Sequence, residues 1–399
     1  MLINFLNSEE LERGFNLSFS FRYSELYASG LAKRVQPDAP LFPVYFPDLS
    51  YTSPFSKNIP MFARRFSLAV ARLALFWPLL MYEIFVLFRL FKLLSPDVLH
   101  INNGGYPAAL SARAAAIAGH FAGVPSIVMV VNNMAADYRH YSRWMDYPVD
   151  RFVVRAVKVF ITGSTAASNR LQKVLGLSDS KLARIHNGIA PRKITESVSS
   201  TRERLGLGSF DGVVFGVVAL LIPRKGHQVL LEAVLKLVTE KTTSLHGNFM
   251  VFIEGDGPLH QELAAFVRRN NLSGFVRFVG DEKNVVDFMM ALDVLVLPSV
   301  EDEDFPNVVI EAMALGKPVI ASRLAGTPEQ VDHGVTGLLV EPRRADQLAG
   351  AMIDLMVDSQ LRYRMGVAAT SCFNNKFTNG KAVANYMNVY KKLVGSVQC

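Results

Sequence analysis

The stretch from Asp293 to Ser322, DVLVLPSVEDEDFPNVVIEAMALGKPVIAS, restricts the possible folds more than any other part of the chain. It begins and ends with apolar runs of strand length, DVLVLPS and PVIAS. Between them lie an acidic loop and the segment VVIEAMALG, whose apolar residues have helical spacing and whose Gly316 is placed as a helix stop. Strand, loop, helix and strand in this order are typical of an α/β domain.

The same alternation of strand and helix continues on both sides of this stretch. Before it, apolar runs that end in polar tips are SPDVLHINN, PSIVMVVNN, VKVFITG and KLARIHNGI, and further runs are VVFGVVALL, NFMVFIEGDGP, Phe275–Gly280 and GLLVEP. Helical patterns separate them, including Pro107–Phe121, a helix to Leu175 capped by Ser164 or Thr165, Leu259–Asn270, Val285–Ala291 and Ala345–Val357. We therefore expect parallel, doubly wound sheets whose ligands lie at the carboxyl ends of the strands.

The length of 399 residues favours two domains. The polar run PRKITESVSSTRER is the best linker candidate. We expect a first domain over residues 1–192, a linker over 193–204, a second domain over 205–375 and a C-terminal helix over 376–399 that packs back on the first domain. The strand predicted at Phe15–Phe21 is preceded by the end of a helix, with Gly14 as its stop, and not by a strand and a Gly-rich turn.

Phe62–Leu94 is a long, very apolar helical region in which we expect Pro78 to cause a kink. Its longest uncharged piece, Leu73–Tyr82, has ten residues, short of the roughly 20 needed to span a bilayer. Two interpretations stay open: a buried helix of the domain, or a helix in a membrane interface. The basic residues of this helix suit either setting, because Arg and Lys side chains can keep their charge in water in both; they are Arg64, Arg65, Arg72, Arg89 and Lys92.

Net charge and cysteine content limit the partners and the compartment. The net charge of +7 favours phosphates or an anionic membrane surface. No aromatic-basic interleaving and no zinc-ligand spacing is present, so we expect no nucleic acid partner. Cys372 and Cys399 are the only cysteines, and MLINFLNSEE has no basic region followed by a long apolar core. These features indicate a cytoplasmic protein.

Three stretches carry residues suited to a nucleotide-type ligand. Arg224, Lys225 and Gly226 combine two cations with a glycine that opens a helix, which suits a pyrophosphate, although basic turns are usually only solvated. The glycines of EGDGP would let a ligand approach the backbone, or would simply form a turn. FVGDEKN would present backbone N–H and C=O groups to a base, or would be only a surface turn. The residues concerned are Glu254, Gly255, Gly257 and Gly280.

Glu303 and Glu311 are separated by seven residues, with Glu303 on the acidic loop and Glu311 in the first turns of the helix. The backbone N–H groups of Asn307, Val308 and Val309 would be unpaired donors at that helix end. Backbone N–H groups that can bind a phosphate, beside carboxylates that can accept hydrogen bonds from hydroxyl groups, suggest a nucleotide-sugar site. A solvated acidic loop is the alternative interpretation.

The second half of the chain resembles the retaining glycosyltransferases of family 4, which have the GT-B fold of two Rossmann-like domains facing a cleft. The matching residues are ALLIPRKGHQVLLEA, IEGDGP, FVG, DVLVLPS, EDFPNVVIEAMA, GKPVIAS, AGTPE and GVTGLLV, and the first half resembles the family's acceptor domain through SPDVLHINN, PSIVMVVNN, VFITGSTAAS and IHNGI. This resemblance covers about residues 90–345.

The resemblance implies roles for individual residues. Glu303 would bind donor-sugar hydroxyls, Glu311 would accept from the ribose, and Lys225 and Arg224 would neutralise the leaving diphosphate. Asn133 would stand at the acceptor-side strand end. The implied donor-binding residues are Gly226, Glu254, Gly255, Gly257, Gly280, Phe305, Asn307, Val308 and Glu311. No metal and no other cofactor is implied, because cations and helix dipoles would stabilise the leaving group.

The sequence departs from the family pattern at three places. Val218 and Ala219 stand where many relatives have a Gly-Arg pair, and Asn132 and Asn133 stand where many have a histidine. An amide hydrogen-bonds a sugar hydroxyl but does not shuttle a proton. The Gly-rich loop near the start is absent from this sequence.

We therefore expect a retaining glycosyltransferase that uses a UDP- or GDP-sugar and a lipid-linked or polysaccharide-type acceptor. It would be cytoplasmic, with peripheral contact at the inner face of the membrane through residues 62–94. The alternatives are a catalytically impaired nucleotide-sugar-binding protein and a GT-B nucleotide-sugar epimerase.

Overall fold

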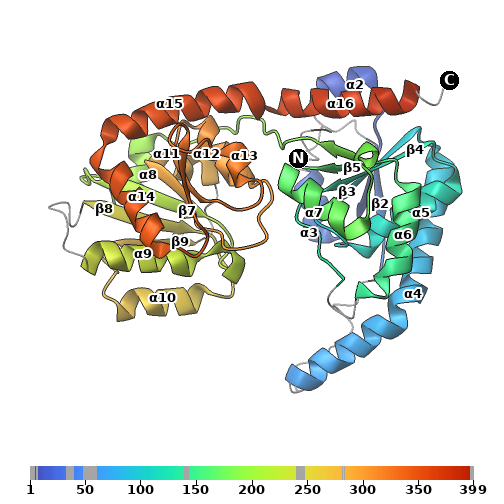
Figure 1. Cartoon of the computed structure of the whole chain (residues 1–399), viewed down its shortest axis with the longest axis horizontal. Coiled ribbons are helices and arrows are strands. Elements are labelled where there is room, and N and C mark those ends of the chain that lie inside the picture. The colour runs from blue at the N-terminus through green and yellow to red at the C-terminus, as the bar shows by residue number, and fades with distance from the viewer. Residues whose placement is uncertain are drawn as a thin grey trace. The chain divides into compact units, whose positions relative to one another are not determined.

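The computed structural model describes residues 5, 8–32, 40–47, 61–138, 143–239, 248–280, 282 and 284–395, without the side chains of 26 and 61–73. The chain divides into two compact units. The first comprises Met1–Thr162, Ser168–Ile185 and Val383–Cys399, and the second comprises Gly163–Ala167 and His186–Ala382. Figure 1 shows the helices and strands of both.

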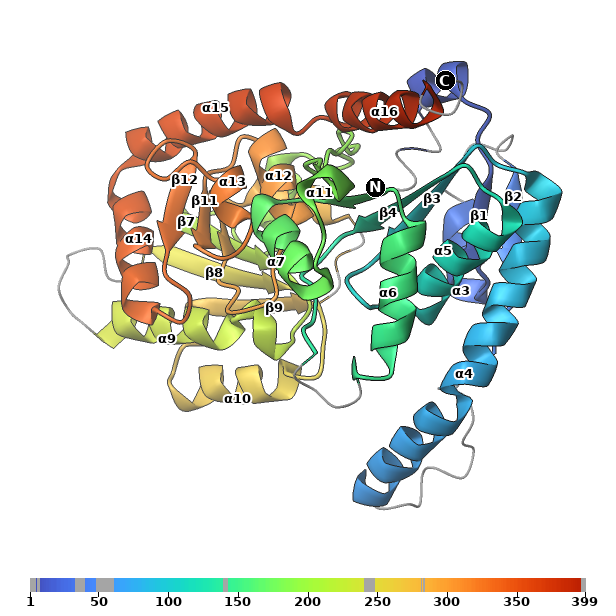
Figure 2. The ribbon, with the colours of Figure 1, turned by 45° about the vertical axis from the view of Figure 1, so that its right-hand side comes forward.

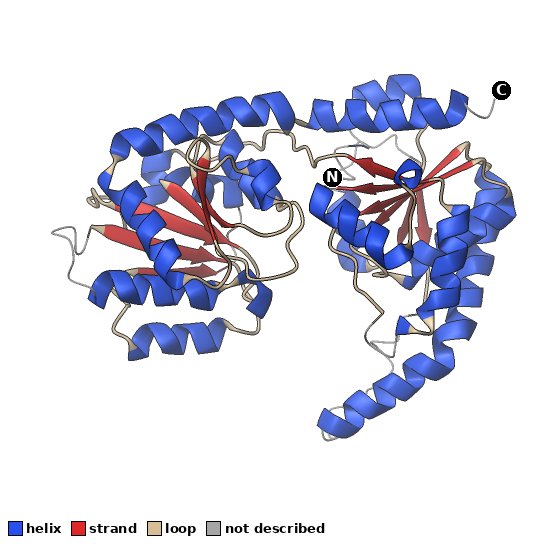
Figure 3. Cartoon of the chain, viewed as in Figure 1, coloured by secondary structure: helices blue, strands red, loops and turns tan. Residues whose placement is uncertain are grey.

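The first unit is built on a parallel sheet in the order β3-β4-β5-β6, with a separate parallel pair β1-β2 (Figure 3). The strands are β1 (Phe19–Arg22), β2 (Leu41–Val44), β3 (Val98–Asn103), β4 (Ser126–Val131), β5 (Val159–Thr162) and β6 (Leu182–Arg184). The helices are α2 (Glu9–Gly14), α3 (Glu25–Ala32), α4 (Met61–Leu94), α5 (Leu110–Ala122), α6 (Asp146–Ala156), α7 (Thr165–Leu175), the 3-10 turn η4 (Asp179–Lys181) and α16 (Asn379–Gly395).

Strand β4 shows how this sheet is covered on both faces. Its six residues are all buried, as expected for a central parallel strand. Ile127, Met129 and Val131 join the core formed with α4, α5 and α6. Val128 and Val130 face the other way and pack with Val383, Tyr386 and Tyr390 of α16. The C-terminal helix therefore closes one face of the first sheet.

Helix α4 is continuous through Pro78 and lies beside α5 (Figure 2). One side of it buries Leu80, Leu87 and Phe91, which fits the interpretation as a domain helix. The other side exposes large apolar residues, namely Leu75, Trp77, Met81, Tyr82, Phe85 and Leu93. Within the described chain, Ala74–Leu94 is the one helical segment long and apolar enough to cross a membrane. This is weak evidence for a membrane span, but it differs from the expectation that the apolar segment would be too short. The side chains of Arg64, Arg65 and Arg72 lie outside the described residues.

The second unit has a six-stranded parallel sheet in the order β12-β11-β10-β7-β8-β9. This is the order of the Rossmann fold, and it reverses between β7 and β10, where such sheets bind ligands. The strands are β7 (Val213–Val218), β8 (Phe249–Glu254), β9 (Val276–Gly280), β10 (Val294–Leu297), β11 (Val319–Ser322) and β12 (Gly337–Val340). The helices are α8 (Val198–Arg204), the 3-10 turn η5 (Pro223–Lys225), α9 (His227–Thr239), α10 (His260–Arg269), α11 (Val285–Ala291), α12 (Asn307–Ala314), α13 (Thr327–Gln330), α14 (Ala345–Val357) and α15 (Ser359–Lys376).

Alternate residues of β7 serve the two faces of this sheet. Phe215 and Val217 pack in the core that contains α9 and α14. Val214 packs in the core that contains α11, α12 and α15. Since α9 follows β7 and α12 follows β10, the two helices leave neighbouring strands on opposite faces of the sheet. Their first residues therefore stand at the switch point between β7 and β10.

The expected fold class, two Rossmann-like parallel α/β units, is confirmed. Two helices are present that were not predicted. Residues 198–204 of the expected linker form α8, capped by Ser197, whose Oγ accepts from Ser200 N at 3.1 Å. Residues 359–376, before the C-terminal helix, form α15, which buries Met365, Ala369 and Phe373 at four-residue spacing along one side.

Candidate active site

The loops that follow β7 and β10 lie against each other. Val300 N donates to Arg224 O at 2.8 Å. A Cβ atom on Gly226 would stand 1.9 Å from Pro298 O, and this residue has φ of 69°. A side chain at position 226 is therefore excluded by the neighbouring backbone. The glycine allows the cationic turn of β7 to touch the acidic loop of β10.

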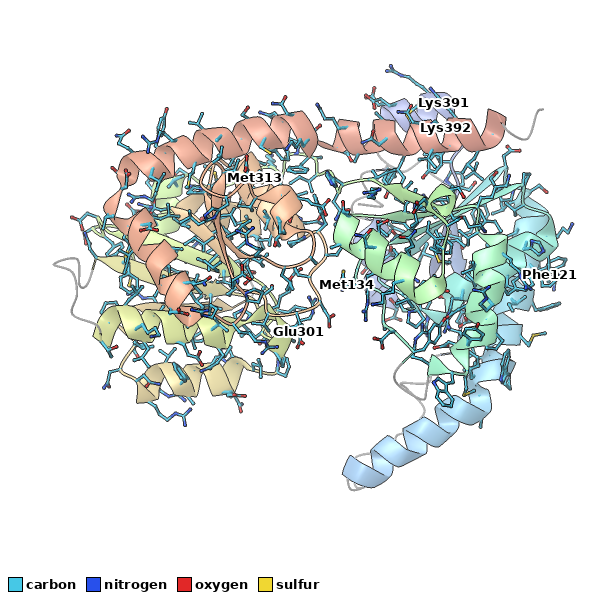
Figure 4. All side chains as sticks on the ribbon, in the orientation of Figure 1. Phe121, Met134, Glu301, Met313, Lys391 and Lys392 are labelled. Carbon is cyan, nitrogen blue, oxygen red and sulfur yellow. The ribbon has the colours of Figure 1, made fainter. Side chains whose placement is uncertain are left out.

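Glu303 is the point where these two loops meet. Its Oε2 accepts from Lys225 Nζ at 2.6 Å and from Ser299 Oγ at 2.7 Å. Arg224 Nη1 stands 3.8 Å from the same oxygen and donates to Asp302 O at 3.1 Å. The side chains of Lys225 and Glu303 are largely buried, so this is a pair in a partly desolvated site. Glu301, on the same loop, is labelled in Figure 4.

Helix α12 begins directly after this loop and has no side-chain cap at Pro306. Val309 N donates to Pro306 O at 3.2 Å, so this amide is not an unpaired donor as expected. The earlier amides of the first turn, at Asn307 and Val308, are the ones that suit an anion. Asn307 is exposed, and its Oδ1 accepts from Asn187 Nδ2 at 3.0 Å.

Phe305 is buried and lies at a ring-centroid distance of 4.8 Å from His186, with the two rings stacked. It also meets the ring of Phe377 edge to face. The side chain therefore belongs to the hydrophobic core, and any contact with a donor would come from its backbone.

Glu311 lies in the middle of α12 and is buried. Its Oε1 stands 2.6 Å from Arg192 Nη2. Burial raises the pKa of Glu311, and the Arg192 guanidinium opposes that rise. Arg192 is the last residue before the expected linker, in the polar run PRKITESVSSTRER, and nothing in the sequence pattern marked it as part of a site.

The glycines after β8 have a structural explanation. A Cβ on Gly255 would stand 2.2 Å from Ala219 O, and one on Gly257 would stand 2.6 Å from Leu221 O. The chain's own backbone after β7 thus approaches these two residues closely. Glu254 is buried and accepts from Glu282 N at 3.3 Å, and Gly280 has φ of 75° with open space at its Cβ. Asp281 and Lys283 of the same turn lie outside the described residues.

A second acidic cluster, missed by sequence reasoning, lies beside Glu303. Asp304 is buried and accepts from Ser164 Oγ, which also caps α7 by accepting from Ala167 N at 3.0 Å. Burial raises the pKa of Asp304 to about 6, and the charge of Glu329 adds to the rise. Glu329 Oε1 accepts from Thr165 N at 2.8 Å. Within a run of four acids, no sequence signal separates this buried residue from solvated ones.

Asn133, the remaining predicted site residue, belongs to the first unit, just after β4. Its Oδ1 accepts from Met134 N at 2.8 Å. Neighbouring Asn132 donates through Nδ2 to Asn102 Oδ1 and to Asn103 O, both at 2.9 Å. Met134 is labelled in Figure 4. All other predicted site residues belong to the second unit, where Arg224, Lys225 and Glu303 are in direct contact.

Two family models match the chain in tandem, and together they cover most of it. Residues 45–193 match the model described as Glycosyltransferase Family 4, and residues 212–358 match Glycosyl transferases group 1. Among solved structures, Alr3699/HepE of Anabaena in complex with UDP aligns with a TM-score of 0.70 and 19% identity, over 99% of this chain and 95% of that one. The fold is thus that of the GT-B glycosyltransferases. The chain belongs to glycosyltransferase family 4.

Curated relatives match over shorter stretches. N-acetyl-alpha-D-glucosaminyl L-malate synthase of Bacillus anthracis is 33% identical over 166 residues, which are 42% of each chain. D-inositol 3-phosphate glycosyltransferase of Streptomyces avermitilis is 32% identical over 235 residues, 55% of this chain and 50% of that protein. The chain therefore spans about half the length of the curated relatives it matches.

Proposed function

We propose that this chain is a retaining glycosyltransferase that moves a sugar from a UDP- or GDP-sugar to a lipid-linked or polysaccharide-type acceptor. The observation that carries this proposal is the contact of Lys225 and Ser299 with Glu303 at the switch point of the second sheet. It combines a cation for a diphosphate with a carboxylate for hydroxyl groups, beside the uncapped first turn of α12. The UDP bound to the Anabaena protein supports a nucleotide donor.

In the proposed reaction the bond between the anomeric carbon and the diphosphate oxygen breaks. The acceptor oxygen bonds to the same face of that carbon, and its proton passes to the leaving phosphate. Lys225 and Arg224 would stabilise the negative charge that develops on the diphosphate, and Glu303 would hold the donor sugar. Stabilisation of this kind acts without a metal, so transfer should persist in EDTA. Among the described residues, no group of three His, Cys, Asp or Glu side chains could hold a metal ion.

The test is donor binding and turnover by the purified chain. Calorimetry with UDP and GDP identifies the nucleotide, and hydrolysis or transfer from the matching sugar donors reports chemistry. Replacement of Glu303 with Gln should abolish turnover, with the melting temperature little changed. Full activity of E303Q would contradict the role of this residue. Tight donor binding without turnover on a broad acceptor panel would favour the catalytically impaired binding protein.

The exposed side of α4 supports a second part of the proposal, contact with the inner face of the cytoplasmic membrane. Trp77, Met81 and Phe85 are exposed on a helix whose other side is buried in the first unit. Apolar residues on one side of a helix with nearby basic residues suit an anionic lipid surface.

Vesicle sedimentation tests the membrane proposal. Binding to anionic vesicles should fall with salt and fall further when Phe85 is replaced with Glu. The matched control is Y363E, which alters another exposed aromatic residue, on α15. Equal recovery with neutral and anionic vesicles would count against membrane docking.

A further inference from the structure

The segment from Asn187 to Thr195 has no regular secondary structure apart from an isolated bridge at Ile189, yet it is held near both ends. Ile189 N donates to Phe377 O at 3.0 Å, and Asn379 N donates to Ile189 O at 2.9 Å. Further along, Thr195 N donates to Asp287 Oδ1 at 2.8 Å. Arg192 stands three residues from each anchor. Its backbone is therefore fixed although it lies in a loop.

The side chain of Arg192 reaches a carboxylate that is far less exposed than itself. The ion pair with Glu311 is 2.6 Å long, and the exposed fractions are 57% for Arg192 and 10% for Glu311. An exposed pair would contribute little, but here one partner is desolvated, and a buried carboxylate needs a compensating charge. The contact occupies Oε1, and the rest of the carboxylate retains lone pairs for further donors.

We propose that Arg192 is a positioning residue of the donor site, which keeps the Glu311 carboxylate ionised and oriented to accept hydrogen bonds from the ribose hydroxyls of a nucleoside diphosphate. This inference rests on the proposed function, because it takes Glu311 as the ribose acceptor. Arg192 acts through Glu311 and needs no contact of its own with the nucleotide.

Calorimetry with UDP, GDP and their 2′,3′-dideoxy analogues tests the inference on the whole chain. Replacement of Arg192 with Gln should weaken binding of the preferred nucleotide roughly 10-fold, the size of a lost charged hydrogen bond. The same variant should bind the dideoxy analogue as tightly as the parent does, because that ligand has no hydroxyls for Glu311. R192K should recover most of the affinity. In turnover, R192Q should raise the donor KM and leave kcat within about twofold.

The variant E311Q distinguishes the ribose role of Glu311 from the positioning role of Arg192. If E311Q binds UDP and GDP as the parent does, the ribose role of Glu311 and the inference both fail. If E311Q binds weakly but R192Q binds normally, the inference alone fails. An equal loss by R192Q for the ordinary and the dideoxy nucleotide would also overturn it, since it would mean direct contact or damage to the fold. The double variant R192Q/E311Q should be no worse than E311Q. R13Q, which breaks an exposed Arg–Glu pair 3.0 Å long in the first unit, is the matched control.

Discussion

The carboxyl ends of the two parallel sheets carry different chemistry. After β7 and β10 of the second unit, Lys225, Arg224 and Glu303 bring charged groups together at the edge of the sheet. After β3 and β4 of the first unit, the corresponding edge carries neutral amides, with Asn132 bonded to Asn102 and to the backbone. The same topology therefore carries charged side chains at the carboxyl ends of the strands in the second unit and neutral amides at those ends in the first.

The first unit does contain buried charges, but they form a closed cluster. Asp150 accepts from Tyr106 at 3.0 Å and from Tyr138 at 2.6 Å. Arg113 and Arg143 each stand within 3.3 Å of Asp150 and also pair with Asp146. The cluster joins α5, α6 and the segment before α6. The comparison suggests that buried charge serves stability in the first unit and ligand binding in the second.

The largest expected effect comes from breaking the closed cluster. Replacement of Asp150 with Ala removes one carboxylate from two arginines and two tyrosines, so the first unit should lose about 3–5 kcal/mol of unfolding free energy. Chemical denaturation, followed by a probe of the first unit, measures this loss. Nucleotide binding to the folded fraction should be unchanged. The control D179A removes an exposed carboxylate that accepts from Gln172. A loss below about 1 kcal/mol in D150A would mean that the cluster is not the stabilising feature inferred here.

The next effect should fall on activity. Replacement of Lys225 with Ala removes the cation closest to Glu303, and kcat should fall roughly 10²–10³-fold, as when one stabilising donor is lost from a transition state. Glu303 keeps its bond from Ser299, so the loss of stability should be only about 1 kcal/mol.

The measurement for K225A is initial-rate transfer with saturating donor, beside a thermal unfolding scan. K391A, which alters an exposed lysine of α16, is the control. Large destabilisation with unchanged kcat would mean that Lys225 contributes to stability, as the buried charges of the first unit do. The contrast between the two units would then be wrong.

Much of the fold was predictable because strand and helix periodicities differ and the central apolar runs, β4, β8, β10 and β11, are buried throughout. Helices α11 and α14 match their predicted bounds. Helix α15 was not predicted, because its buried stripe, Met365, Ala369 and Phe373 at four-residue spacing, is narrow and lies among polar residues; the helix packs against α12.

A site residue was predictable only where its side chain suits the ligand and its position follows a predicted strand. Lys225 and Glu303 were singled out separately, as a cation before a helix-opening glycine and as a carboxylate on a loop after a strand, and the family resemblance assigned both to the donor site. Phe305, expected to bind the nucleotide, is part of the core. Arg192 and Asp304 were missed, because their contacts, to Glu311 of α12 and to Ser164, join segments that are distant in sequence. Burial that depends on tertiary contacts leaves no mark in the local pattern.

Glu83 is a buried acidic residue of the first unit that lies outside the cluster around Asp150. It lies on α4 with 6% exposure, and its Oε2 has no hydrogen-bond partner among the described residues. Burial raises the pKa of Glu83 to about 7, although Arg22 and Arg113 lower it. Because the folded state holds this proton more tightly than the unfolded chain, stability should decrease as pH rises from the ordinary pKa of 4.5 through about 7.

Replacement of Glu83 with Gln should remove this pH dependence and have the smallest effect of the three. At pH 5 the parent is mostly protonated, so E83Q and the parent should have similar unfolding free energies. At pH 8 the parent contains a buried, ionised carboxylate, and E83Q should be more stable by about 1–3 kcal/mol, the upper value being what the full shift would give. Denaturation curves at both pH values measure the difference. If E83Q gains nothing between pH 5 and pH 8, Arg22 and Arg113 compensate the charge, and Glu83 belongs with the paired carboxylates of the first unit.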